Sequence, residues 1–268
     1  MFDSADDYTL VDAVERLTAM LKAAHRVVML TGAGISTESG IPDFRSPGGL
    51  WETYRPIHYV DYMRKPAVRA EFWSRSHVTV PLFANAQPNA AHYAVAALQA
   101  AGRLSALITQ NVDGLHQRAG SPDVLELHGS YLWVRCTVCT ARCTRLDVHR
   151  RIAALNPPEA IAAGAAIVPD CAACGGLLKP DVVFFGENVP AARTAEAIAC
   201  AEAADLFLVV GSSLAAYSGY RLPLRAIEAG AKLALLNLGP TRIDARTDFL
   251  LRARAGLVLP MLAARLCA

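Results

Sequence analysis

Two groups of residues in this chain have types and spacings suited to chemistry. The first is the segment from Met29 to Arg45, MLTGAGISTESGIPDFR, in which an apolar run enters a Gly-x-Gly turn. A buried strand that feeds such a turn and then a short helix presents backbone N–H groups to a pyrophosphate, and glycine lets the main chain approach closely. Thr37 stands where a dehydrogenase fingerprint has its third glycine. The segment therefore predicts a dinucleotide loop that is not a dehydrogenase loop.

The second group is two Cys-x-x-Cys pairs, formed by Cys136, Cys139, Cys171 and Cys174. Four thiolates in this arrangement make a closed tetrahedral zinc site with no position for water, so its predicted role is structural. The alternative is a redox Cys-x-x-Cys or free buried thiols, which two pairs disfavour. Cys143 is a rival ligand near the first pair, but it lacks the two-residue spacer. Cys200 and Cys267 are interpreted as small hydrophobic residues.

The apolar periodicity predicts the scaffold that positions these groups. An amphipathic helix opens the chain over 10–21. Strands are predicted at 26–31, 104–109, 124–127, 182–185, 206–210 and 232–237, and further helices at 89–101, 191–203 and around 223–229. This alternation predicts an α/β fold with a Rossmann-like doubly wound parallel sheet. Ligands of such sheets bind beyond the carboxyl ends of the strands, which is where the polar motifs of this chain fall.

We expect one domain over 1–268, with two departures from this rhythm. Residues 46–88 are rich in aromatic residues and prolines and lack clean periodicity, which predicts a flexible loop followed by short helices. Residues 132–180 carry the cysteine pairs and break the α/β pattern. That break predicts an inserted zinc-binding lobe.

Composition excludes several classes of protein. The chain has 268 residues, 53% of them hydrophobic, and a net charge of +2, which argues against a dedicated nucleic-acid or membrane-surface protein. No apolar run approaches the roughly 20 residues that span a bilayer. The acidic N-terminus lacks the features of a secretory signal. Seven cysteines, four of them at metal-type spacing, favour a reducing, cytoplasmic setting.

The order of the motifs resembles the sirtuins, the NAD-dependent protein deacylases. The matching blocks are GAGIS-x-ES-GIPDFR, TQNVDGLH at 109–116, LHG at 127–129, FFGE at 184–187 and GSSL at 211–214. The resemblance covers nearly the whole chain. It implies a single sirtuin-type catalytic domain that uses NAD, holds a structural zinc ion and acts on acylated-lysine protein substrates.

The resemblance also implies the reaction. The acyl oxygen of the modified lysine attacks the anomeric carbon of the nicotinamide ribose, nicotinamide leaves, and the acyl group ends on ADP-ribose. His128, at a predicted strand end, would deprotonate a ribose hydroxyl, and a pKa of roughly 6.5 suits such a general base. Asn111 is a neutral donor and acceptor suited to orienting ribose hydroxyls. His128 and Asn111 are therefore the predicted catalytic residues.

The predicted binding residues come from several parts of the chain. For the cofactor they are Gly32, Ala33, Gly34, Ser36, Glu38, Asp43, Phe44, Arg45, Trp51, Gln110, Asn111, Asp113, His128, Gly211, Ser212, Ser213, Asn237, Leu238, Gly239 and Ala255. In the family an extended substrate peptide adds strand-like hydrogen bonds in the cleft between the lobes. The resemblance places that peptide at Val183, Phe184, Gly186 and Glu187.

Three functions are compatible with these motifs. The leading one is an NAD-dependent protein lysine deacylase, and the second is a mono-ADP-ribosyltransferase, which would use the same NAD site. An intact His128 favours deacylation, because that reaction needs the base. The third is a non-catalytic NAD-sensing or zinc-mediated interaction module, which the intact catalytic blocks disfavour.

The acyl preference is predicted from one helical segment. Sirtuins that remove succinyl or malonyl groups carry a Tyr-x-x-Arg pair after the cofactor loop, and Trp73 and Ser76 stand at those positions here. Arg75 is one residue early, which turns it about 100° away on a helix. With the block Tyr217–Arg221, these features resemble the class II branch. We expect longer or branched apolar acyl groups to be preferred over succinyl; the alternative is that Trp73 is a core residue beside an ordinary acetyl pocket.

Overall fold

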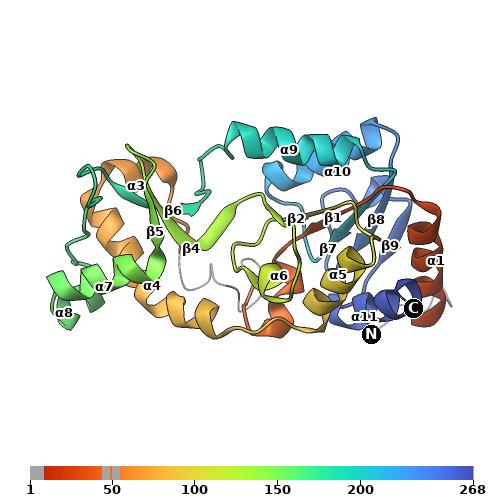
Figure 1. Cartoon of the computed structure of the whole chain (residues 1–268), viewed down its shortest axis with the longest axis horizontal. Coiled ribbons are helices and arrows are strands. Elements are labelled where there is room, and N and C mark those ends of the chain that lie inside the picture. The colour runs from red at the N-terminus through yellow and green to blue at the C-terminus, as the bar shows by residue number, and fades with distance from the viewer. Residues whose placement is uncertain (1–8, 44–48, 50–54, 268) are drawn as a thin grey trace.

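The computed structural model describes residues 9–43, 49 and 55–267 and has two lobes, shown in Figure 1. The large lobe contains a six-stranded sheet, and the small lobe contains a three-stranded sheet. Within the described residues, no helix has both the length and the apolar character needed to cross a membrane.

The six-stranded sheet is parallel throughout. In spatial order its strands are β3 (Leu125–Glu126), β2 (Ala106–Thr109), β1 (Val27–Thr31), β7 (Leu206–Val210), β8 (Lys232–Leu236) and β9 (Phe249–Leu251). The central strands β1 and β7 are buried along their whole length. Strands buried on both faces are continuous apolar runs, as this sequence has. The predicted doubly wound α/β sheet is confirmed.

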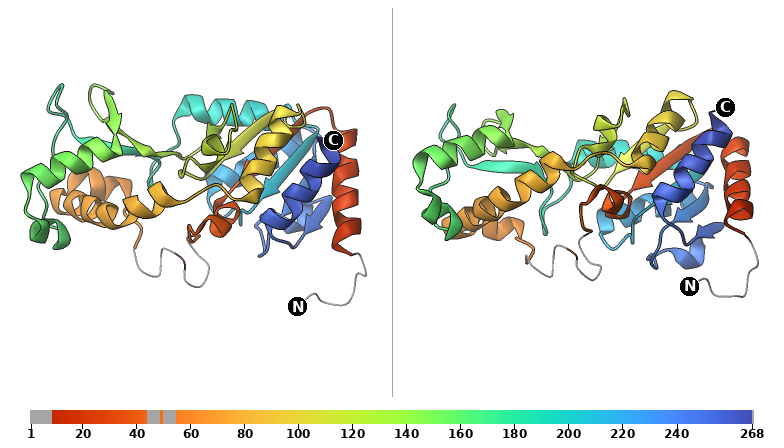
Figure 2. Two further views of the ribbon diagram at one scale, coloured as in Figure 1. Left: turned by 60° about the horizontal axis from the view of Figure 1, so that its bottom comes forward. Right: turned by 90° about the horizontal axis from the view of Figure 1, so that it is seen from below.

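Helices cover both faces of this sheet, as Figures 1 and 2 show. One face packs on α1 (Leu10–Ala23), α5 (Ala90–Ala100) and α11 (Ala255–Leu266), and the other on α9 (Ala191–Glu202) and α10 (Tyr217–Glu228). Successive residues of β1 divide between the two cores, with Met29 in the first and Leu30 in the second. Helix α1 begins at a reciprocal capping box between Thr9 and Asp12, which satisfies two of its unpaired N–H groups.

The small lobe is antiparallel, with β4 (Gly129–Cys136) between β5 (Arg142–Thr144) and β6 (Leu178–Val182). Its helices are α3 (Tyr59–Arg64), α4 (Pro66–Asn85), α7 (Arg145–Leu155) and α8 (Pro158–Ala162); a short helix, α6 (Leu115–Arg118), follows β2. Trp73 of α4 is 0% exposed and donates to Tyr62 Oη, which in turn donates to the Leu178 carbonyl. This chain of bonds joins α4, α3 and β6 into one core.

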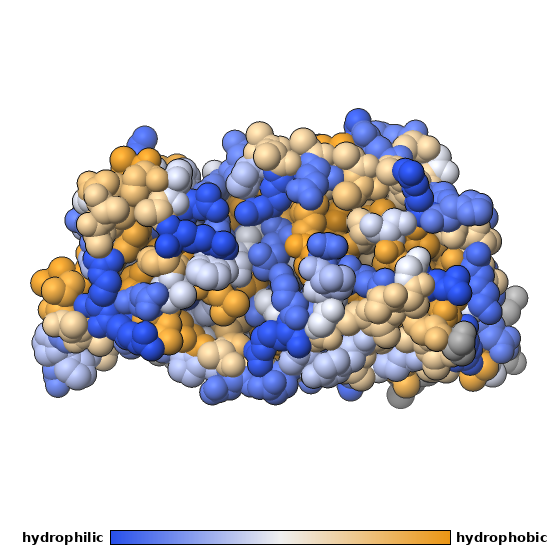
Figure 3. Space-filling view, viewed as in Figure 1, coloured by the Kyte–Doolittle hydropathy of each residue, from blue (hydrophilic) through white to orange (hydrophobic). Residues whose placement is uncertain are grey.

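The surface of the small lobe mixes hydrophobic and hydrophilic side chains, as the left of Figure 3 shows. Its exposed large apolar residues include Val138, Leu146, Leu155 and Ile167.

Three sequence expectations differ from the structure. The strand predicted over 182–185 is wrong, because β6 ends at Val182 and pairs with β4 of the small sheet. An apolar run indicates burial but not which sheet buries it. Of the short helices expected after the loop, α3 is present, but α4 is one 20-residue helix that contains Pro81. Strand β9 and helix α11 were not predicted. The loop expected at the start of 46–88 lies largely outside the described residues.

Candidate active site

A cleft of about 1620 Å³ lies between the two lobes. Gly32, Gln110, Gly211 and Asn237 line it, and each directly follows a strand of the parallel sheet. The opposite wall comes from the segment after β6 and from α4. The polar motifs therefore meet beyond the carboxyl ends of the strands, as the strand-end rule predicts.

The glycine turn after β1 is built directly against the turn after β7. The Gly34 N–H donates to the Gly211 carbonyl at 2.8 Å, and the Gly32 N–H donates to the Val210 carbonyl at 3.0 Å. A Cβ at Gly34 would lie 2.9 Å from Gly211 Cα, and Gly211 has a φ of 61°. Glycine at both positions allows the two backbones to touch.

These bonds correct one expectation about the turn. The N–H groups of Gly32 and Gly34 are used within the protein and do not face a pyrophosphate. Between them lies the Ala33 N–H, which has no acceptor within the described part of the chain, and the same holds for the Ser212 and Ser213 N–H groups. All three residues line the cleft. They are among the backbone donors in the cleft that are available to an anionic ligand.

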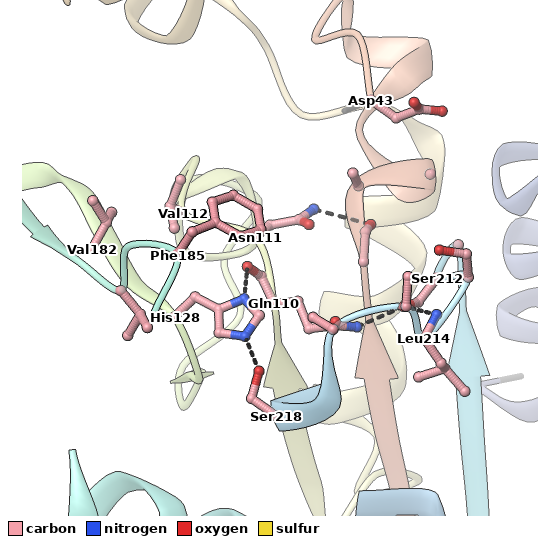
Figure 4. A pocket seen from close by; sticks show the side chains of 18 of the residues that line it. Asp43, Gln110, Asn111, Val112, His128, Val182, Phe185, Ser212, Leu214 and Ser218 are labelled. Atoms are coloured by element: carbon pink, nitrogen blue, oxygen red, sulfur yellow. Dashed lines mark hydrogen bonds between the residues drawn. The ribbon is translucent and has the colours of Figure 1, made fainter. Parts of the chain in front are cut away.

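His128 lies between β3 and β4 and lines the cleft. Its Nδ1 is 3.0 Å from the Gln110 carbonyl oxygen, and its Nε2 is 2.8 Å from Ser218 Oγ, as Figure 4 shows. Because a carbonyl only accepts, Nδ1 carries the proton and Nε2 accepts from the serine hydroxyl. Burial lowers the pKa of His128 to about 4, although the bond to Gln110 opposes the shift. The imidazole is neutral at pH 7.

Asn111 is fixed by its side-chain amide. Its Nδ2 donates to the Gly32 carbonyl at 3.1 Å and to Ser36 Oγ at 3.0 Å, and Ser36 donates to Asp113 at 2.8 Å. Asp113 also accepts from the Leu115 N–H, and burial raises the pKa of its carboxyl group. Ser36 and Asp113 are buried and do not line the cleft. The two residues support Asn111 from behind, and their contact with the cofactor stays a prediction.

Gln110 and Ser212 connect two strand ends. The Gln110 side chain donates to Ser212 Oγ at 2.7 Å, and Ser212 Oγ also accepts from the Leu214 N–H at 3.2 Å. Glu38, which follows the glycine turn, accepts from the Gly256 N–H in the first turn of α11. A carboxylate at that position is favoured by the helix dipole.

The segment predicted to bind the substrate peptide is hydrogen-bonded to the backbone of His128. The Val183 N–H donates to the His128 carbonyl at 2.9 Å. Phe184 is buried, and its N–H donates to the Glu187 carboxylate, which also lies 2.9 Å from Lys179 Nζ. The Glu187 carboxylate is therefore already occupied by groups of the protein itself. These bonds hold the segment in place, and contact of Glu187 with a substrate peptide stays a prediction.

The four predicted zinc ligands converge in the small lobe. The sulfur atoms of Cys136, Cys139, Cys171 and Cys174 all lie within 4.8 Å of one another. Two of the separations are 3.5 Å (Cys136 to Cys174) and 3.7 Å (Cys139 to Cys171). Tetrahedral Zn–S bonds of about 2.3 Å require sulfurs roughly 3.8 Å apart, so the cluster fits a Zn²⁺ ion. Cys143 lies outside the cluster.

Most of the predicted binding residues share the cleft. Its walls include Gly32, Ala33, Gly34, Glu38, Asp43, Gln110, Asn111, His128, Val183, Phe184, Gly186, Glu187, Gly211, Ser212, Ser213, Asn237, Leu238, Gly239 and Ala255. Phe44, Arg45 and Trp51 lie outside the described residues.

Ser218 and Arg145 line this cleft but were not among the predicted site residues. Ser218 contacts the candidate base, and the only signal for it was its place in the block Tyr217–Arg221. Arg145 also lines the cleft, from the first turn of α7. No signal in the sequence distinguishes Arg145 from the many surface arginines.

The chain is similar to known proteins over most of its length. A model described as the Sir2 family matches residues 32–218. A Xanthomonas axonopodis protein named NAD-dependent protein deacetylase is 45% identical over 255 residues, which cover 89% of this chain and 85% of the relative. The Drosophila melanogaster NAD-dependent protein deacylase Sirt4 is 39% identical over 270 residues, covering 94% and 86%.

The fold is also similar to solved structures. A Sir2 structure with a p53 peptide and NAD+ superposes with a TM-score of 0.80 at 35% identity, over 94% of this chain and 96% of the other.

Proposed function

This chain belongs to the Sir2 family, and we propose that His128 is the general base of its reaction. The protein is an NAD-dependent deacylase that transfers the acyl group of a modified lysine to ADP-ribose and releases nicotinamide. The observation that supports the role of His128 is its pair of hydrogen bonds. With Nδ1 held by the Gln110 carbonyl, Nε2 is the nitrogen that can take a proton.

We assign the residues that line the cleft the following roles in this reaction. NAD, when bound, supplies an activated ribose. The N–H groups of Ala33, Ser212 and Ser213 would bind its phosphates, and Asn111 would orient the ribose hydroxyls. His128 would accept the proton of one hydroxyl at Nε2, in place of its bond with the Ser218 hydroxyl.

The zinc ion holds the small lobe together in this proposal. Cys136 ends β4 and Cys139 follows it, whereas Cys171 and Cys174 precede β6, so one ion would join both ends of the insert. Four thiolates leave no position for a catalytic water.

We further infer that the chain lies in the class II branch of the sirtuins. The identity with Drosophila Sirt4 and the block Tyr217–Arg221 support this assignment. The protein substrates proposed here are acylated-lysine proteins, because a related Sir2 structure holds a p53 peptide.

The proposed function is tested by incubating the protein with NAD and an acetyl-lysine peptide, followed by mass spectrometry. We expect nicotinamide, acetyl-ADP-ribose and free lysine. ADP-ribose attached to protein would indicate a transferase instead. His128→Ala is expected to lower turnover by about 100- to 10,000-fold while NAD binding, measured by calorimetry, is retained. His25→Ala, at an exposed position, is the matched control. Near-normal turnover of His128→Ala would exclude the assignment of the base.

A further inference from the structure

Arg145 is a buried cation that has no carboxylate partner in the described part of the chain. It is 4% exposed, yet it lines the cleft. Among the described residues, no Asp or Glu lies within ion-pair distance of it. Its Nη1 donates to the Tyr131 carbonyl at 3.3 Å, and its guanidinium carbon lies 3.7 Å from the Tyr131 ring centroid. Burying a charge is costly unless an opposite charge pairs with it.

The other neighbours of Arg145 are neutral. Its Nε donates to Ser76 Oγ at 2.9 Å, and Ser76 in turn lies 2.8 Å from His149 Nε2. Because Ser76 Oγ accepts from the arginine, its hydroxyl proton points to His149. His149 then donates from Nδ1 to His77 Nδ1 at 2.6 Å. Burial lowers the pKa of both imidazoles, that of His149 to about 3, so neither carries a charge at neutral pH.

The second terminal nitrogen of Arg145, Nη2, is the group that can still donate hydrogen bonds. Nη2 has no acceptor in the part of the chain that the structure describes. The aromatic rings of Phe72 and Tyr131 surround the guanidinium at centroid distances of 5.3 and 3.7 Å and make its environment largely apolar. A carboxylate that enters such a site gains a charge-assisted hydrogen bond with little competition from water.

The position of Arg145 relative to His128 and Asn111 indicates which part of an acylated lysine it could contact. Tyr131 lies three residues after His128 along β4, which corresponds to about 10 Å of strand. The Tyr131 N–H donates to the carbonyl of Val112, the residue next to Asn111. The guanidinium is therefore at the small-lobe end of the cleft, beyond the catalytic pair and in the direction of α4.

We propose that Arg145 binds the distal carboxylate of a dicarboxylic acyl group, such as succinyl or glutaryl, on the substrate lysine. This inference rests on the deacylase function proposed above, and it names the class of acyl group. It replaces the expectation of a longer or branched, largely apolar acyl group, which was drawn from Trp73 and Ser76. Trp73 is a core residue outside the cleft, and Ser76 holds the arginine that α7 supplies. A cation thus reaches this site from a different helix.

The test compares acyl groups on one lysine peptide. The kcat/KM of the wild-type protein is measured for acetyl, valeryl, glutaryl and glutaramyl, the last being the neutral amide of glutaryl. We expect glutaryl to exceed both valeryl and glutaramyl by about 10- to 100-fold, the range for a hydrogen bond to a charged group. A parallel series with succinyl and butyryl tests the shorter chain. Neutral acyl groups equal to or better than their carboxylated partners in both series would overturn the proposal.

Variants separate a specific contact from a structural role. Arg145→Met is expected to lose the preference for carboxylated acyl groups while keeping its kcat/KM for valeryl, and Arg145→Lys to keep part of the preference. The matched control is Arg142→Met, an exposed arginine that stacks on Trp133 outside the cleft. An equal loss on every acyl group in Arg145→Met would mean that the arginine is structural only.

The outcomes also distinguish the two proposals. Turnover of acetyl-lysine without any preference for carboxylates leaves the deacylase function standing and excludes the role of Arg145. If no acyl peptide releases nicotinamide, the proposed function fails and this inference fails with it. The wild-type comparison of glutaryl with glutaramyl decides the matter even if Arg145→Met does not fold.

Discussion

His128 Nδ1 donates to the backbone carbonyl of Gln110 at 3.0 Å, and this contact selects the tautomer of the candidate base. Gln110 directly follows β2, and His128 follows β3, its neighbour in the sheet. The register of two adjacent parallel strands therefore determines which imidazole nitrogen is available in the cleft. A side-chain acceptor could rotate away, whereas a backbone carbonyl at a strand end is fixed.

Asn111→Asp is expected to impair both activity and stability. The Asn111 Nδ2 donates to the Gly32 carbonyl and to Ser36, and a carboxylate would direct an acceptor at that carbonyl, close to Asp113. Leaving such buried groups unsatisfied costs about 1–3 kcal/mol each. The measurements are Tm and kcat/KM for an acetyl-lysine peptide. Asn85→Asp, at an exposed position, is the control, and an Asn111→Asp protein that behaves like it would contradict the network.

Gly34→Ala is expected to raise KM for NAD at least tenfold and to lower stability. The added Cβ would lie 2.9 Å from Gly211 Cα, so the two turns that border the nucleotide site must separate. Overpacking of this kind costs about 1–3 kcal/mol. The wild-type protein is the reference for both measurements. An unchanged KM for NAD in Gly34→Ala would show that the contact with Gly211 is unimportant.

Removal of zinc is expected to unfold the small lobe and leave the parallel sheet intact. The sulfurs of the cluster join β4 to the segment before β6, and metal binding of this kind is coupled to folding. Cys171→Ser should lose stoichiometric zinc and the hydrogen-exchange protection of residues 129–182. Cys143→Ser is the control, since Cys143 lies outside the cluster. Full zinc content in Cys171→Ser would refute this ligand set.

Stability is expected to fall as the pH is lowered from 7 to 4.5. Burial lowers the pKa of His92 to about 4 and that of His116 to about 3, well below the roughly 6.5 of an unfolded chain. The folded state therefore resists protonation, and this contribution is complete above pH 6.5 and is lost as the pH falls toward the folded pKa. His116 Nε2 bonds Thr31, and its buried Nδ1 has no partner among the described residues.

The pH effect is measured as Tm between pH 7 and 4.5. His92→Gln, which removes one of the two rings, is expected to show a shallower decline than the wild-type protein. Asp113 acts in the opposite sense, because burial raises its pKa and its protonation favours the folded state at low pH. A Tm that is constant over this range would mean that the histidines are not the acid-labile groups.

Much of the site could be predicted from local sequence. Turn chemistry and apolar runs located the strand ends at Gly32, Gln110 and Gly211, and spacing alone identified the four cysteines. Local patterns could not assign 182–185 to the small sheet. They could not show that Ser36 and Asp113 lie behind Asn111, because partners 75 and 77 residues apart are brought together only by the fold.

The sequence by itself determined the parallel sheet, the zinc ligands and the candidate base, since each depends on residue types at short spacing. The tertiary structure decided which groups are available to a ligand. In the folded chain the N–H groups of Gly32 and Gly34 bond to other backbone groups, and Nε2 of His128 is the nitrogen that faces the cleft. Arg145 also lines the cleft, although it is distant in sequence. The physical reason is that availability depends on hydrogen-bond partners and burial, which involve residues distant along the chain.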